Sequence, residues 1–503
     1  MRYLNMTHAV RLAAIATVAA LAAACVNDRI VYRGDGQQFT QPPAAAQSFV
    51  GYSSTTDKKT VCGNCHVDQQ TNWSQTAHAK AWADLQASGH ASSSCEACHT
   101  VSKLGNAATA DSVGYVATKD ARYHDVQCES CHGAGLQHVT APGLSNRPLA
   151  TLAVDTGAAF GTGCGECHTG THEPFVDEWK ASAHGNPARA PAVSNYVSGS
   201  NTTCVGCHTA QGALAAWGIN TNYLEKDQMT TKPLGVTCAV CHDPHTAQNG
   251  KQLRFPVDVP DESQNLCMKC HHRRANPDPT SSSGPHSPEG PTLLGYAGWW
   301  APNLVISSPD TIVATHGTTT NPKLCATCHV SRFTVNDPKT GNFAFQATGH
   351  KFVAIPCLDP TTGIPTAGDC DISQRTFKAC TGSGCHGSEA SARSAMVAAE
   401  SDAALLIDQL TTLTTKVKAA LPSEINTKDG KITTLEGSIF NLALAKATGA
   451  VEHNPFLIKA LLAGSIRQMQ TDYATQLGAA ASMSPAVSAA MSRAITQLQS
   501  LKH

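Results

Sequence analysis

Cysteine and histidine recur together along this 503-residue chain in one fixed pattern. The pattern Cys-x-x-Cys-His occurs eight times, with these residues: Cys62, Cys65, His66, Cys95, Cys98, His99, Cys128, Cys131, His132, Cys164, Cys167, His168, Cys204, Cys207, His208, Cys238, Cys241, His242, Cys267, Cys270, His271, Cys325, Cys328 and His329. A ninth segment has a wider gap between its two cysteines, and consists of Cys380, Cys385 and His386. Thiols and imidazoles at such spacing can bind metal ions, form disulfides or bond covalently to a cofactor.

The histidine directly after the second cysteine distinguishes these interpretations. A zinc ribbon needs no histidine at that position, and a disulfide scaffold leaves eight identical histidines without a role. Haem c uses all three residues, because two thiols a turn apart add to the two vinyl groups of one porphyrin. The adjacent imidazole then lies under the iron. The pattern therefore predicts eight covalently attached haems, and the wider-gap segment predicts a ninth.

Fourteen of the 23 histidines lie outside these attachment segments. Leaving out one near each end of the chain, twelve remain, so each of nine irons could receive a second histidine. Local context selects eight distal ligands: His78, His138, His184, His245, His286, His316, His350 and His453. His172 and His272 compete for the ninth place. We expect no iron at His90 and His124, which lie close before attachment segments.

Methionine is the usual alternative to a second histidine. Only Met229 and Met268 fall within the attachment stretch of the mature chain, so methionine cannot serve nine irons. The sequence therefore predicts coordination by nitrogen throughout. It also predicts low reduction potentials, because methionine ligation raises the potential of a haem.

The first 24 residues are typical of an export signal. Arg2 and Arg11 supply positive charge, and the apolar stretch 12–24 is too short for a permanent membrane span. The small residues before Cys25 resemble a bacterial lipoprotein processing site, at which Cys25 becomes the lipid anchor. The alternative is ordinary cleavage before Cys25, which leaves that residue a free thiol.

The composition limits the remaining possibilities. A formal net charge of -1 provides no basic field to attract nucleic acid. Alanine inflates the hydrophobic fraction of 41%, and large apolar residues are sparse for the length of the chain. Bound haem is therefore expected to fill much of the interior and to order short polar segments that could not otherwise fold.

The first six attachment segments predict a duplicated triplet. In each copy the first segment is followed by Trp-x-x-Thr/Ser-Ala-His, at Trp73 to His78 and at Trp179 to His184. Such repeats favour an elongated array. The predicted divisions are a signal peptide (1–24), a lipid-anchored tether (25–61), a first three-haem module (62–160), a second three-haem module (161–262), a third, longer-looped haem segment (263–390) and a C-terminal helical region (391–503).

The predicted fold class is mostly α and irregular, a multihaem array with few strands and a C-terminal helical cap. Glycine, proline, serine and threonine between the motifs favour short helices and loops. Leucine, isoleucine and methionine at helical spacing predict four helices near the C-terminus, over 394–421, 438–448, 455–470 and 485–501. Cys357 and Cys370 lack a histidine partner, and are either a disulfide that closes a short loop or two free thiols.

Through these motifs, residues 62–390 resemble the multihaem c-type cytochromes of the outer surface or periplasm of metal-respiring bacteria. The resemblance implies closely stacked haems that conduct electrons towards extracellular acceptors such as metal oxides. Other c-type cytochromes or an outer-membrane porin complex are the implied partners. The segment 450–455 is similar to the distal-histidine segment of cytochrome c nitrite reductases, but their Cys-x-x-Cys-Lys site does not occur in this sequence.

We therefore expect an exported electron carrier rather than a dedicated oxidoreductase, with histidine on both faces of each iron. An outer-membrane lipoprotein is expected, on the periplasmic or cell-surface face, with a periplasmic or secreted protein as the alternative. Two other functions stay open. One is a reductase of metals or of nitrogen or sulfur oxyanions with an open haem site, and the other is a subunit of a cytochrome filament.

Overall fold

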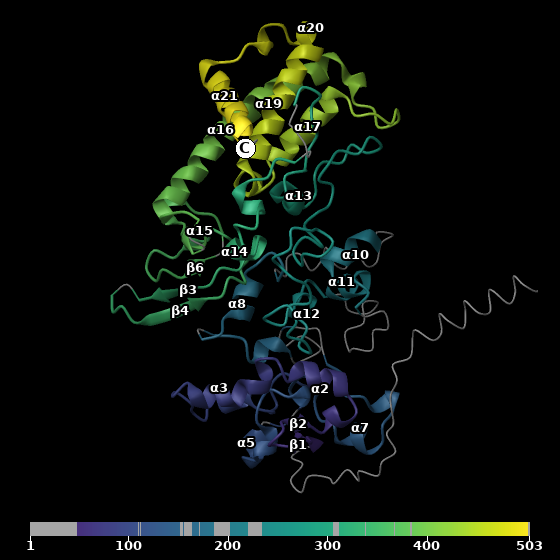
Figure 1. Ribbon diagram of the computed structural model, residues 1–503, viewed down its shortest axis with the longest axis vertical. Coiled ribbons are helices and arrows are strands. Elements are labelled where there is room, and N and C mark those ends of the chain that lie inside the picture. The colour runs from purple at the N-terminus through teal and green to yellow at the C-terminus, as the bar shows by residue number, and fades with distance from the viewer. Residues whose placement is uncertain are drawn as a thin grey trace, which may run out of the picture.

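The computed structural model describes residues 48–108, 110, 112–150, 154, 163–170, 172–185, 202–219, 234–304, 311–337, 339–366, 368–382 and 385–500. The predicted signal peptide and Cys25 lie outside these residues. None of the helices in the described ranges is both long and apolar enough to cross a membrane. The chain extends along one axis, with β1, β2 and α2 near one end and the last helices at the other (Figure 1).

Residues 48–387, the attachment region, contain helices of seven residues or fewer among the described parts. The α-helices are α2 (Val67–Trp73), α3 (Ala81–Ala87), α4 (Glu96–His99), α5 (Gly114–Thr118), α6 (Cys128–His132), α7 (Leu136–Thr140), α8 (Phe175–Lys180), α10 (Thr202–His208), α11 (Ala210–Ala216), α12 (Cys238–Cys241), α13 (Glu289–Leu293), α14 (Cys325–His329) and α15 (Lys378–Thr381). The 3-10 turns are η2 (Cys62–Asn64), η3 (His78–Lys80), η4 (Ala121–Tyr123), η5 (Leu144–Asn146), η6 (Cys164–Glu166), η8 (Thr315–Gly317) and η9 (Ile372–Gln374). Most attachment segments thus begin or form a short helical turn, which brings their two thiols close together.

Six short strands form three antiparallel hairpins in the described region. They are β1 (Tyr52–Ser54) with β2 (Lys59–Thr60), β3 (Phe333–Asn336) with β4 (Phe343–Ala347), and β5 (Cys357–Leu358) with β6 (Pro365–Thr366). In the longest hairpin Phe333 lies opposite Ala347. The predicted fold class, mostly α and irregular with few strands, is confirmed.

Residues 388–500 form the helical cap. Its helices are α16 (Glu389–Ala420), η10 (Pro422–Glu424), α17 (Thr434–Ala445), α18 (Ala450–His453), α19 (Pro455–Asp472), α20 (Ala474–Leu477), η11 (Gly478–Ala481) and α21 (Pro485–Ser500). The predicted starts of the first two long helices, at residues 394 and 438, were wrong by several residues. Capping boxes at Ser388 and Thr433 satisfy the free N–H groups one turn earlier, so α16 and α17 begin there.

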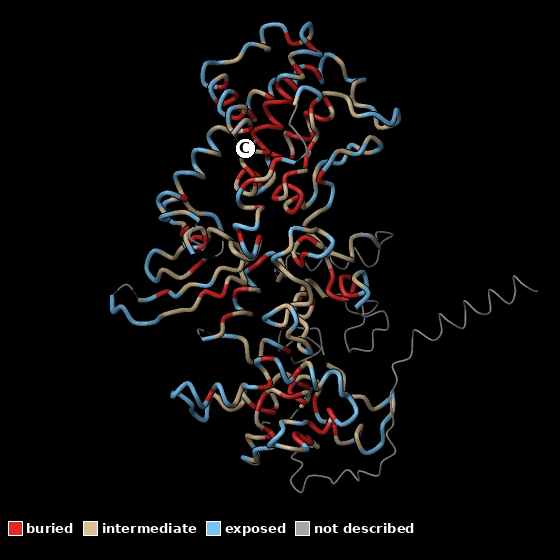
Figure 2. The backbone as a smooth tube through the Cα atoms, viewed as in Figure 1, coloured by how far each residue is buried: buried red, intermediate tan, exposed pale blue. Residues whose placement is uncertain are grey.

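Buried residues gather in the cap and are more scattered elsewhere (Figure 2). Leu406, Leu410, Leu413, Leu457 and Leu461, among others, form a large core cluster between α16, α17, α19 and α21. The other clusters in the described chain hold three or four buried residues each. The expectation of a chain poor in apolar core therefore holds for the attachment region and is wrong for the cap.

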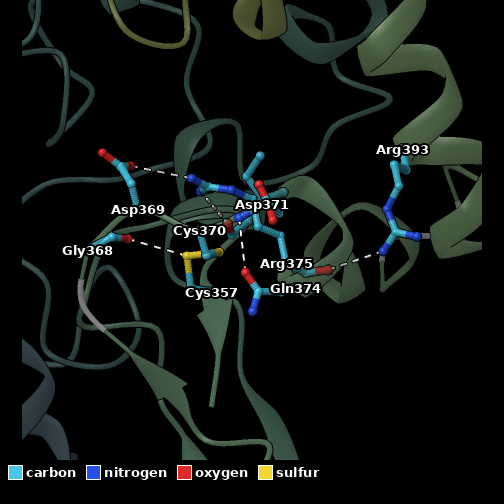
Figure 3. Close-up of a disulfide and its surroundings, with 9 residues drawn as sticks. Cys357, Gly368, Asp369, Cys370, Asp371, Gln374, Arg375 and Arg393 are labelled. Carbon is cyan, nitrogen blue, oxygen red and sulfur yellow. Dashed lines mark hydrogen bonds and ion pairs between the residues drawn. A yellow bond between two sulfur atoms is a disulfide. The ribbon is translucent and has the colours of Figure 1, made fainter. Parts of the chain in front are cut away.

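Cys357 and Cys370 form a disulfide with their Cα atoms 6.0 Å apart, which resolves the two predicted alternatives (Figure 3). The bond closes the loop that contains β5 and β6. Arg375 lies beside it, and its guanidinium bonds the Ile355 carbonyl and lies 3.4 Å from the Asp369 carboxylate. The disulfide therefore fixes the loop that precedes the wider-gap segment.

Candidate haem-attachment sites

Eight of the nine attachment histidines face the ring of a second histidine. The ring centres are 5.9 to 6.5 Å apart in every pair. The pairs are His66 with His138, His168 with His78, His132 with His245, His271 with His184, His208 with His286, His242 with His350, His386 with His316, and His329 with His453. All eight histidines that local context selected are among these partners.

This separation is the one that two ligands of a single metal ion require. An imidazole nitrogen lies about 2 Å from a metal ion that it binds and about 1 Å from its own ring centre. Two rings on opposite sides of one ion therefore have centres about 6 Å apart. The eight pairs leave room for one ion between the rings, and they are too far apart to stack on each other.

The Nδ1 atoms of many paired rings already have hydrogen-bond partners, so Nε2 is the atom that would bind a metal. Nδ1 of His132, His242 and His329 each lies 2.9 Å from a backbone carbonyl oxygen. Among the partners, His316 Nδ1 lies 2.9 Å from the Glu452 carbonyl oxygen. A hydrogen bond at Nδ1 fixes both the tautomer and the ring orientation, as in other histidine-ligated metal sites.

Burial keeps several of the partner rings neutral. Desolvation, and then the nearby His168, lowers the pKa of His78 to about 4. Desolvation, and then the nearby His329, lowers the pKa of His453 to about 4 in the same way. These imidazoles are therefore uncharged at physiological pH, and neutral imidazole is the form that binds metal.

The duplicated triplet keeps one tryptophan hydrogen bond in both copies. Trp73 Nε1 donates to the Val126 carbonyl at 3.0 Å, and Trp179 Nε1 donates to the Val236 carbonyl at 2.9 Å. Each acceptor lies two residues before the third attachment segment of its own triplet. The tryptophan thus ties the first and third segments of a module together, and the histidine five residues later crosses to the next module.

A buried glutamate that the sequence did not reveal holds one of the partner rings. Glu178 is 2% exposed, and its carboxylate accepts from the Thr348 N–H, the Thr348 hydroxyl and the His350 N–H at 2.6 to 2.9 Å. These bonds place His350 opposite His242. The first repeat has Asn72 at the corresponding position, so the duplication gave no signal for Glu178.

A second buried glutamate, Glu129, fastens the start of the described chain to the third attachment segment. Its carboxylate accepts from the N–H groups of Val50, Gly51 and Gly135 at 2.8 to 2.9 Å. Burial nevertheless raises the pKa of Glu129 to about 7. Nothing in the sequence indicated this role, because Glu129 fills a variable position between two attachment cysteines. Only the fold brings the three N–H donors to its carboxylate.

The attachment thiols form contacts between different segments. The contacting pairs are Cys62 with Cys128, Cys98 with Cys167, Cys164 with Cys238, Cys207 with Cys270, and Cys267 with Cys325. Electrostatic interactions also place Cys131 near Cys164, Cys241 near Cys270, and Cys328 near Cys380. None of the 18 attachment cysteines forms a disulfide, so their thiols are available for thioethers.

One continuous cavity of about 5810 Å³ runs along these contacts, and residues of all nine attachment segments line it. A pocket for one small molecule has about 300–1,000 Å³, so this cavity has room for several large planar groups. The space, the thiol pairs and the facing imidazoles fit haem c. When bound, haem supplies an iron that gains and loses one electron.

His99 stands apart from the other attachment histidines. Its Nδ1 lies 2.9 Å from the Ala81 carbonyl oxygen, but no second histidine ring faces it within the described residues. Of the two candidates for the ninth place, His172 is exposed and His272 Nδ1 lies 2.6 Å from the Met268 carbonyl oxygen.

The two histidines for which no iron was expected also stand away from the pairs. His124 stacks on Trp82 with ring centres 4.1 Å apart, and His90 is exposed. Met268 is fully buried beside Leu293 and Leu324, where it fills a small apolar cluster. Met229 lies outside the described residues.

Comparisons with known proteins agree with this chemistry. Residues 61–133 match the family model described as "Cytochrome c554 and c-prime", and residues 232–276 match a model of a doubled CXXCH motif. A search of curated proteins finds no match.

Two solved structures are similar in part. The outer cell wall cytochrome OcwA is 16% identical, with a TM-score of 0.46 over 75% of this chain and 76% of that one. An undecaheme cytochrome from the S-layer of Carboxydothermus ferrireducens is 18% identical, with a TM-score of 0.48 over 86% of this chain and 70% of that one.

The eight motifs and the two family models define the class: the chain is a multihaem c-type cytochrome. Haem c is its cofactor, and electron transport is the activity that this class supports.

Proposed function

We propose that this cytochrome is an electron relay that holds nine haems in a connected series, eight of them between two histidines. The eight facing pairs along one cavity carry this proposal. With both faces of an iron occupied by protein ligands, its environment changes little on reduction, which suits electron transfer. The protein's own part is to fix the order, spacing and potentials of the cofactors.

The thiol contacts suggest the order of the relay. Numbered along the sequence, segments 1, 3, 4, 6, 7, 8 and 9 follow one another through contacts or close approaches. Within the described residues, segment 2 meets this line at segment 4, through Cys98 and Cys167. Segment 5 meets it at segment 7, through Cys207 and Cys270, in the same described part. The second segment of each triplet is therefore a side position.

Removal of single attachment sites tests this order. Replacing Cys204 and Cys207 with alanine removes a side position, and replacing Cys164 and Cys167 removes a main-line position. Film voltammetry should record the loss of one electron of charge in both variants, but slower electron exchange only in the second. Visible spectra check that the remaining haems stay attached. Equal slowing in both variants would overturn the order.

The wider-gap segment is proposed to carry the ninth haem. His386 faces His316 at 6.3 Å although the Cys380 and Cys385 thiols are separated by four residues. Pyridine haemochrome assay with intact mass should therefore give nine haems per chain. Replacing Cys380 and Cys385 should reduce the count to eight, and a wild-type count of eight would exclude this site.

A second function is favoured by one observation: among the described residues, no histidine ring faces His99. An iron at that site would have a face that no described histidine covers, where an external small ligand could bind, so reduction of a small oxyanion there is the second candidate. Carbon monoxide should bind to one haem per reduced chain at most. Its failure to bind would remove this candidate without affecting the relay.

We also propose that the protein is exported and anchored through an acylated Cys25. The N-terminal charge, the apolar stretch and the small residues before Cys25 support this. Mass spectrometry of the mature N-terminus should find a lipid-modified Cys25, and Cys25→Ala should release the protein from the membrane fraction. An unmodified mature N-terminus would contradict the anchor.

Other c-type cytochromes, an outer-membrane porin complex and metal oxides are the proposed partners. The net charge of -1 gives no strong overall field, so association with a soluble acceptor should depend weakly on salt. Stopped-flow oxidation by a chelated ferric ion at low and high ionic strength tests this. A steep salt dependence would point to a localised charged docking site.

A further inference from the structure

The two triplets place their second attachment segments in equivalent positions. Cys98 and Cys207 are the second cysteines of those segments. Cys98 contacts Cys167, and Cys207 contacts Cys270. In both cases the partner is the second cysteine of the first segment after that triplet. His99 and His208 therefore belong to corresponding sites.

The chain that follows the partner segment returns in the same way in both places. The Val176 N–H donates to the His168 carbonyl at 3.0 Å, and the Gly290 N–H donates to the His271 carbonyl at 2.9 Å. Each donor lies in the first turn of a short helix, α8 or α13. These two bonds align the residues just before Val176 with those just before Gly290, independently of the thiol contacts.

A histidine lies four residues before the donor in both segments. Before Gly290 it is His286, whose ring faces His208 at 6.2 Å. Before Val176 it is His172, which lines the same cavity as His99. The alignment thus puts His172 in the place from which His286 supplies the second ligand of the corresponding site.

The two histidines differ in whether they face the attachment histidine of their site. Both side chains are exposed, but the His286 ring faces His208 at 6.2 Å, whereas no histidine ring faces His99 within the described chain. The return from His168 to Val176 takes eight residues, against nineteen from His271 to Gly290. Asp177 also tethers the segment between His168 and Val176, because its carboxylate accepts from the Thr169 hydroxyl and the Gly170 N–H at 3.0 and 2.7 Å. The shorter, tethered return holds His172 back from the position that His286 reaches.

We propose that His172 is a weak second ligand of the iron that His99 holds, one that an external small ligand displaces. The proposal rests on the proposed haem relay and concerns its side position. Glu173, next to His172, lies 3.7 Å from His168 Nδ1, so the same short segment contacts the main-line site. In the absence of an external ligand, His172 occupies the second face of this iron. The external ligand takes that place when it binds.

Carbon monoxide binding to the reduced, fully loaded protein tests this. In the wild type the observed binding rate should level off as carbon monoxide increases, because release of His172 becomes limiting. In His172→Ala the rate should rise linearly, and the apparent affinity should increase about tenfold if the site is free in about a tenth of wild-type molecules. The ferric variant should gain one high-spin haem in its electron paramagnetic resonance spectrum.

Two matched variants make the result specific. His272→Ala removes another histidine beside an attachment segment and should leave both readouts unchanged. His286→Ala removes the counterpart ligand and should give one high-spin haem at the other side position, which shows that one iron in nine is detectable. Identical carbon monoxide kinetics and high-spin content in the wild type and His172→Ala would overturn the proposal. A correct haem count with bulk low-spin spectra would still support the relay in that case.

Discussion

The attachment region and the helical cap reach a folded state by different means. The cap buries a large cluster of leucine, isoleucine and alanine side chains between four long helices. The attachment region has only small apolar clusters, and its thiols and imidazoles line a long cavity instead. The difference shows that one chain can divide its stability between apolar packing at one end and a covalently bound cofactor over the rest.

The largest effect is expected when haem attachment is withheld. A chain made without cytochrome maturation should keep the helices of the cap, while residues 48–387 stay unfolded because their small clusters cannot offset the entropy of ordering. Limited proteolysis with mass spectrometry should yield a resistant fragment that begins near Glu389. Equal resistance of both regions would remove the distinction between them.

A large-to-small substitution in the cap should have the next largest effect. Leu410 is fully buried in the cap cluster, so Leu410→Ala should lower the free energy of unfolding by about 2–5 kcal/mol. The matched substitution Leu85→Ala, on α3 of the attachment region, should cost less than half as much, because Leu85 lies outside the apolar clusters. Urea titration followed by circular dichroism measures both. A larger loss for Leu85→Ala would reverse the comparison.

Loss of the disulfide should destabilise one loop of the attachment region. Cys357 and Cys370 are 13 residues apart, and a bond that closes a loop of about 15 residues contributes about 3 kcal/mol by restricting the unfolded chain. The double alanine variant should exchange its amide hydrogens faster over residues 357–376. The cap should exchange as before, and a change spread over the cap would show that the two regions fold as one unit.

The smallest expected effect is on the stability of the cap at acid pH. Hydrogen bonds from Arg493, opposed by partial burial, lower the pKa of Asp402 in the cap. Because the folded pKa lies below the unfolded value of about 3.9, the ion pair stabilises the cap above about pH 4. That contribution is lost as the pH falls through the folded pKa. It should be about 1 kcal/mol or less, because Arg493 is half exposed.

Thermal unfolding between pH 3 and 6 measures this contribution. Asp402→Asn should flatten the pH dependence of the cap over that range. The exposed pair of Asp369 and Arg375 in the attachment region is the matched control, and Asp369→Asn should leave the profile unchanged. An unaltered profile in Asp402→Asn would mean that other carboxylates govern acid unfolding.

The sequence predicted which histidines take part in facing pairs better than it predicted how they pair. Local context selected the eight histidines that face an attachment histidine, because tryptophan, glycine and proline mark where a turn can direct a ring. Which ring faces which could not be predicted, since the partners are 70 residues apart at the least, as in His316 and His386. Only the fold brings such segments together.

Two further features escaped prediction for physical reasons. The starts of α16 and α17 depend on side-chain caps at Ser388 and Thr433, which precede the apolar periodicity by several residues. Glu178 resembles an ordinary surface glutamate in sequence, and only its burial against Thr348 and His350 gives it a positioning role. The burial of a side chain depends on neighbours that are distant in the chain. The start of a helix depends on capping residues that lie outside the apolar periodicity.

The crossed pairing of histidines has a consequence for biogenesis. The eight pairs overlap along the sequence, so a chain interrupted anywhere between His66 and His453 separates at least one attachment histidine from its partner. The last partner, His453, is made only after every attachment segment has been made. A prematurely ended copy would thus leave at least one attachment histidine without the ring that faces it, so the overlapping pairs make the site geometry depend on synthesis through residue 453.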